Sequence, residues 1–141
     1  MKRPVTLQMG RLLLLVAAIA FGISGWAFIS SLNSGLPAPI WGGILALIAT
    51  ITGVSGTWFV SYEKNAAAWL SAAFLLIGVS LLAGLIIIKT GWGGETNIGA
   101  GGIFFIGMHL LPVAGVIALL TVIVTWVRDS RARTQHAQVT E

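Results

Sequence analysis

His109 and Pro112 are the residues whose types and spacing could carry chemistry in this chain. Both lie in the uncharged apolar stretch from Ile103 to Val127, where an ionisable residue is rare and points to a function. Because proline has no N–H, a helix through this stretch leaves the carbonyl of Met108 without its usual partner. An imidazole beside a free carbonyl suits a quinone headgroup, a metal or haem ligand, or the transfer of a proton.

A structural role for His109 is the other interpretation. A neutral imidazole can hydrogen-bond to a neighbouring helix and hold transmembrane segments together. His109 lies roughly 10 Å inside the outer end of its segment, at about 1.5 Å per residue. Ser24, Ser80 and Thr50 lie within its reach if the segments pack as a bundle. A haem within one copy is disfavoured, because the other histidine, His136, follows the last apolar stretch.

The remaining polar residues argue against an enzyme. The chain has no cysteine, and its acidic residues all lie outside the apolar stretches. No Ser–His–Asp set, carboxylate pair or metal-binding cluster falls within one compartment. The glycine-rich segment Lys89–Gly102 lacks the residue order of a phosphate-binding loop, and we interpret it as a flexible connector. We therefore expect no catalytic residue, no metal and no resident cofactor, with haem or a quinone at His109 as the alternative.

Four apolar segments must position these residues. The chain has 141 residues, of which 57% are hydrophobic and 9% are charged. Soluble domains carry about 25% charged residues, so this composition indicates an integral membrane protein. Each segment is long enough to cross a bilayer, and the first is longer than the core of a cleaved signal peptide. We predict spans over 12–31, 40–61, 67–88 and 103–127, a basic N-terminus over 1–11 and a mobile polar tail over 128–141.

The basic residues predict the orientation. They gather at the two chain ends and in the short middle loop: Lys2, Arg3, Arg11, Lys64, Arg128, Arg131 and Arg133. The other two loops carry only Lys89. Positive residues favour the cytoplasmic side, so both termini are predicted to be cytoplasmic in a plasma membrane. The formal charge of +4 therefore reflects contact with lipid headgroups rather than nucleic acid, and Arg128 and Arg131 are expected to anchor the last helix.

The tryptophans agree with this threading. All six fall near a predicted membrane interface, where aromatic rings are enriched. The outer set is Trp26, Trp41 and Trp92, and the inner set is Trp58, Trp69 and Trp126.

Small residues predict the contacts between spans. Residues without bulky side chains, spaced four apart, let helix backbones approach closely. The second span is the richest, with Ala49, Gly53 and Gly56, and the third contributes Gly84. We therefore expect the second span to be the most central.

The order of spans resembles that of small four-span bacterial membrane proteins, including an actinobacterial group. The second span running through the Tyr62–Asn65 turn into Trp69, and the Met108–His109–Leu110 sequence, carry this resemblance. It implies the four-span fold and no activity, so no functional residue follows from it.

These observations predict an all-α, four-helix transmembrane bundle. The leading functional hypothesis is a non-enzymatic protein that acts by association, as an accessory subunit of other membrane proteins or as a homo-oligomer. The first alternative is a redox-linked membrane subunit that uses His109 at a quinone or haem site. The second is a small dimeric transporter or channel.

Overall fold

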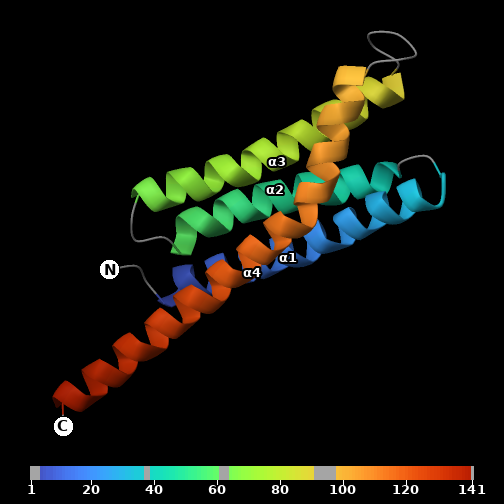
Figure 1. Ribbon diagram of the computed structural model, residues 1–141. Coiled ribbons are helices and arrows are strands. Elements are labelled where there is room, and N and C mark those ends of the chain that lie inside the picture. The colour runs from blue at the N-terminus through green and yellow to red at the C-terminus, as the bar shows by residue number, and fades with distance from the viewer. Residues whose placement is uncertain (1–3, 37–38, 61–63, 91–97, 141) are drawn as a thin grey trace.

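The computed structural model describes residues 4–36, 39–60, 64–90 and 98–140, and the elements in these ranges are four α-helices (Figure 1). They are α1 (Pro4–Asn33), α2 (Ile40–Val60), α3 (Lys64–Thr90) and α4 (Ile98–Thr140). Each is long and apolar enough to cross a membrane. The prediction of an all-α protein with four candidate transmembrane helices is confirmed.

Helices α1, α3 and α4 reach beyond the predicted spans, most of all α4, which has 43 residues, whereas α2 lies within its predicted span. The prediction begins this span at Ile103 and expects a mobile tail after Val127, whereas the helix starts at Ile98 and runs to Thr140. Residues 128–140 contain no proline or glycine and are rich in arginine, alanine and glutamine, which favour a helix. The end of α4 therefore extends past the other three helices (Figure 1).

A glycine cap ends α1. Gly35 has a φ of +68°, a left-handed conformation that glycine adopts without steric cost. The backbone N–H of Leu36 donates to the carbonyl of Ser31 at 2.9 Å, and that of Gly35 donates to Leu32 at 3.2 Å. This pair of bonds is a Schellman motif, which satisfies the last carbonyls of the helix.

The four helices form a ring. Helix α1 packs against α2 and α4, and α3 packs against the same two helices, while α2 and α4 barely touch each other. In their membrane-length windows, 44% of the residues of both α1 and α2 are buried, compared with 22% in α4. The second span is therefore as buried as the first, and the expectation that it is the most central is not confirmed.

Phenylalanine side chains fill the space enclosed by the four helices. The side chains of Phe21, Phe28 and Phe74 are fully buried. Phe21 and Phe74 stack with their centroids 5.7 Å apart, and Phe28 meets Phe104 edge-on at 5.3 Å. The first contact joins α1 to α3, which lie on opposite sides of the bundle, and the second joins the neighbouring helices α1 and α4.

Glycines set the closest helix contacts. A Cβ on Gly56 would lie 2.8 Å from the carbonyl oxygen of Gly10, so α1 and α2 touch backbone to backbone. A Cβ on Gly84 would lie 3.0 Å from the Cα of Phe104, at the contact of α3 with α4. The predicted packing residues Ala49, Gly53, Gly56 and Gly84 are all buried.

Candidate functional site

His109 lies on the outside of the bundle. Its side chain is exposed on α4, and its Nδ1 lies 2.9 Å from the carbonyl oxygen of Phe105, one turn earlier. The two rings also contact each other, with centroids 4.4 Å apart. Because a carbonyl only accepts, Nδ1 carries the proton in this bond and Nε2 of the neutral ring is left as an acceptor. Nε2 is therefore a polar atom that the apolar part of α4 presents to its surroundings.

The two residues predicted to act with His109 face elsewhere. Met108 is 1% exposed and belongs to the core. Pro112 is half-buried at the contact with α1, where a Cβ on Gly25 would lie 2.9 Å from its Cδ. Because Gly25 has no side chain, the proline ring reaches the backbone of α1. Pro112 therefore contributes to helix packing.

A groove runs beside this contact between α1 and α4. It has a volume of about 510 Å³. Its walls are uncharged and combine an indole, hydroxyl groups and an amide with aliphatic surface. The lining residues are Gly22, Trp26, Ile29, Ser30, Asn33, Ser34 and Pro112. His109 is not among them, so its ring and the groove are separate features of the α4 surface.

The hydroxyl residues expected near His109 are used within the bundle. Ser24 is fully buried and donates to the carbonyl of Gly42 at 2.7 Å, which links α1 to α2. Thr50 donates to Ala46 at 2.8 Å within α2, and its side chain occupies the space that a Cβ on Gly78 would need. Ser80 is half-buried on α3. The structure does not bring these hydroxyls to His109, and Ser24 forms the link between helices instead.

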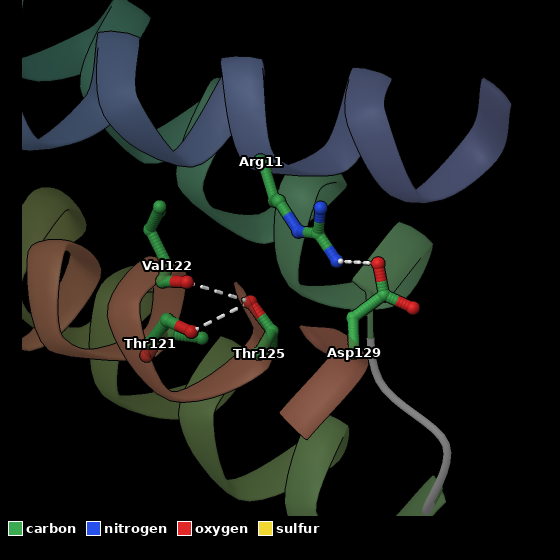
Figure 2. A network of polar contacts seen from close by, with 5 residues as sticks. All are labelled: Arg11, Thr121, Val122, Thr125 and Asp129. Atoms are coloured by element: carbon green, nitrogen blue, oxygen red, sulfur yellow. Dashed lines mark hydrogen bonds and ion pairs between the residues drawn. The ribbon is translucent and has the colours of Figure 1, made fainter. Parts of the chain in front are cut away.

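Arg11 and Asp129 form an ion pair that the sequence analysis missed. Nη2 of Arg11 on α1 lies 3.1 Å from Oδ2 of Asp129 on α4, and the side chains are 14% and 20% exposed. Figure 2 shows the pair beside Thr125, which donates to carbonyls of its own helix. A signal was available: two opposite charges lie just outside the predicted ends of the first and last spans, on the same side.

The predicted anchors lie on the surface. Arg128 and Arg131 are exposed on α4. The described tryptophans of the two interface sets are exposed as well: Trp26, Trp41, Trp58, Trp69 and Trp126. Trp92 lies outside the described residues. Exposed positions of this kind are compatible with the predicted membrane topology.

The described part of the chain offers few reactive groups. It contains no group of three histidine, cysteine, aspartate or glutamate residues that could hold a metal ion. What the arrangement provides is an imidazole acceptor on an outer helix surface, an uncharged groove and one interhelical ion pair. Comparisons of the chain with known protein families, with curated proteins and with solved structures gave no match.

Proposed function

We propose that this protein acts by association within the membrane, and that one face of α4 meets the partner. The face consists of Phe105, His109, Val113, Val116 and Leu120, which recur at three- to four-residue intervals and so lie on one side of the helix. All five side chains are exposed. We call this set the outer face of α4.

His109 is the observation that supports this proposal. Polar side chains within transmembrane segments almost always face the bundle interior, a water-filled cavity or a partner group. An imidazole nitrogen left unpaired in hydrocarbon has a substantial desolvation cost. Within the described residues, Nδ1 is satisfied by Phe105 and Nε2 has no partner. A hydroxyl, amide or indole N–H from another membrane chain would satisfy it.

The low burial of α4 supports the same proposal. In the membrane-length window of α4, 22% of the residues are buried, compared with 44% in that of α1, although the mean hydropathy of the two windows is similar. The helix also extends past its neighbours (Figure 1). A second copy of this chain or another membrane subunit would pack along this surface. We place the protein in the plasma membrane with both ends cytoplasmic.

The native mass of the full-length protein, extracted from its own membrane in mild detergent, tests the proposal. We expect a particle heavier than one chain, and a shift toward the single chain in His109→Ala. Leu76→Ala is the matched control, because Leu76 is an exposed residue of α3 outside the outer face of α4. A wild-type protein that runs as a single chain would contradict the proposal. A His109→Ala particle as heavy as that of wild type would show that His109 does not contribute to the association.

A redox-linked role is the second candidate, and the same hydrogen bond favours it. A histidine that ligates haem iron commonly donates its other ring nitrogen to a carbonyl, as Nδ1 of His109 does toward Phe105. Nε2 would then face the iron, and a second copy would supply the other ligand. An absorption spectrum of the native particle should show a haem band that disappears in His109→Ala. A haem band that persists in that variant would overturn this candidate.

A further inference from the structure

We infer that the end of α4 binds the headgroup of an anionic phospholipid between Arg128 and Arg131. Both arginines are exposed, and neither has an ion-pair partner among the described residues. They are three residues apart on a helix, which places both guanidinium groups on one side, about 4.5 Å apart along the axis. Guanidinium groups bind phosphate oxygens through paired hydrogen bonds, so two at this spacing suit one phosphate.

The ion pair with α1 makes this charge available. Asp129 lies between the two arginines in the sequence and would partly neutralise them from an outward position. In the structure its carboxylate turns toward α1 and binds Arg11 at 3.1 Å (Figure 2). The acidic group therefore faces the bundle while the arginines face outward. The outer side of this helix end has a net positive charge.

The helix holds the arginines at a fixed spacing. The sequence alone suggested a mobile tail after Val127, but α4 continues to Thr140 without a break. Arg128 follows Val124 by four residues and Arg131 follows Val127 by four, so each cation lies above an exposed valine on the same face. This order places a cationic end directly beyond an apolar surface.

That order favours a phospholipid over other anions. Exposed Ile123, Val124 and Val127 offer aliphatic surface for an acyl chain, and the arginines offer charge for its phosphate. Free phosphate or a nucleic acid would use the charges and leave the aliphatic surface uncovered. This site lies beyond the outer face of α4, so it does not depend on the proposed association.

Native mass spectrometry of the delipidated full-length protein in a neutral detergent tests the inference. We expect dioleoyl phosphatidylglycerol to form a one-to-one adduct more tightly than dioleoyl phosphatidylcholine. The double variant Arg128→Gln/Arg131→Gln should weaken the phosphatidylglycerol adduct about 30-fold, since each cation near a lipid surface contributes a factor of about five. Arg128→Lys/Arg131→Lys keeps both charges but loses the paired hydrogen bonds, so its affinity should lie between those of wild type and the glutamine variant.

A control variant that removes the same number of positive charges elsewhere distinguishes binding at this site from a general effect of the protein's net charge. Lys64→Gln/Lys89→Gln removes two exposed cations from α3 and should leave the adduct within about twofold of wild type. Equal weakening in both double variants would overturn the site. Equal affinity for the two lipids, or binding of inorganic phosphate as tight as that of phosphatidylglycerol, would overturn the assignment to an anionic lipid. Circular dichroism of each variant verifies that the helices are intact.

Discussion

Arg11 and Asp129 join the first helix to the last through an ion pair of 3.1 Å at one end of the bundle. The side chains are 14% and 20% exposed, so the pair is partly shielded from solvent. Exposed pairs contribute up to about 1 kcal/mol, whereas removing one partner of a buried pair costs about 3–5 kcal/mol. Nε of Arg11 is buried without a hydrogen-bond partner, which lowers the net gain. We therefore expect the loss of either partner to cost more than in an exposed pair and less than in a buried one.

Removing either partner should therefore destabilise the bundle. Arg11→Gln and Asp129→Asn are each expected to lower the free energy of unfolding by about 1–2 kcal/mol, because the remaining charge loses its counterion. The double variant should lose less than the sum of the single losses. Unfolding in a denaturing detergent, followed by circular dichroism, measures all three. Lys64→Gln should stay within about 0.5 kcal/mol of wild type, and strictly additive losses would show that the pair has no coupling energy.

Two glycine positions should respond to alanine in opposite directions. Gly56→Ala places a Cβ 2.8 Å from the carbonyl oxygen of Gly10, which forces α1 and α2 apart and should cost about 1–3 kcal/mol. Gly22→Ala meets no atom within 4 Å, so the gain in helix propensity should stabilise α1 by about 0.5–1 kcal/mol. The same unfolding assay compares the two variants. Equal effects would refute the close contact of the helix backbones.

The number and approximate positions of the spans could be predicted from the sequence, but the surfaces with which they face each other could not. A bilayer is as apolar as a protein core, so the hydrophobic pattern does not separate an inward residue from an outward one. Small residues are the better guide, and Gly53, Gly56 and Gly84 are indeed buried. They did not reveal the ring arrangement, because α1 uses Gly10 and Gly25 in the same way.

The direction in which the side chain of His109 points could not be predicted from the sequence either. Its depth could be estimated by counting residues, but its direction depends on how α4 crosses α1 and α3. Those contacts are formed by Pro112 against Gly25 and by Phe104 against Gly84. They turn Met108 inward and leave His109 outside. The pairing of Asp129 with Arg11 could have been anticipated, since both charges flank predicted spans on the same side.

The buried hydroxyl of Ser24 should stabilise the contact of α1 with α2. It donates to the carbonyl of Gly42 at 2.7 Å, away from solvent. Ser24→Ala removes the donor while keeping the helix propensity high, so a loss of about 0.5–1.5 kcal/mol is expected. Ser34→Ala, at an exposed position, provides the comparison. A loss no larger than that of the control would mean that this hydrogen bond is neutral in the bundle.

The proposed orientation predicts which ends can be labelled from outside. Because the chain has no cysteine, single cysteines introduced at exposed positions report accessibility without background. Ser34→Cys lies after α1 and Thr134→Cys lies near the end of α4, both exposed in the structure. With cytoplasmic termini, a membrane-impermeant maleimide should label Ser34→Cys in intact cells and Thr134→Cys only after lysis. The reverse pattern would invert the orientation, and labelling of both in intact cells would contradict the three spans proposed between the two positions.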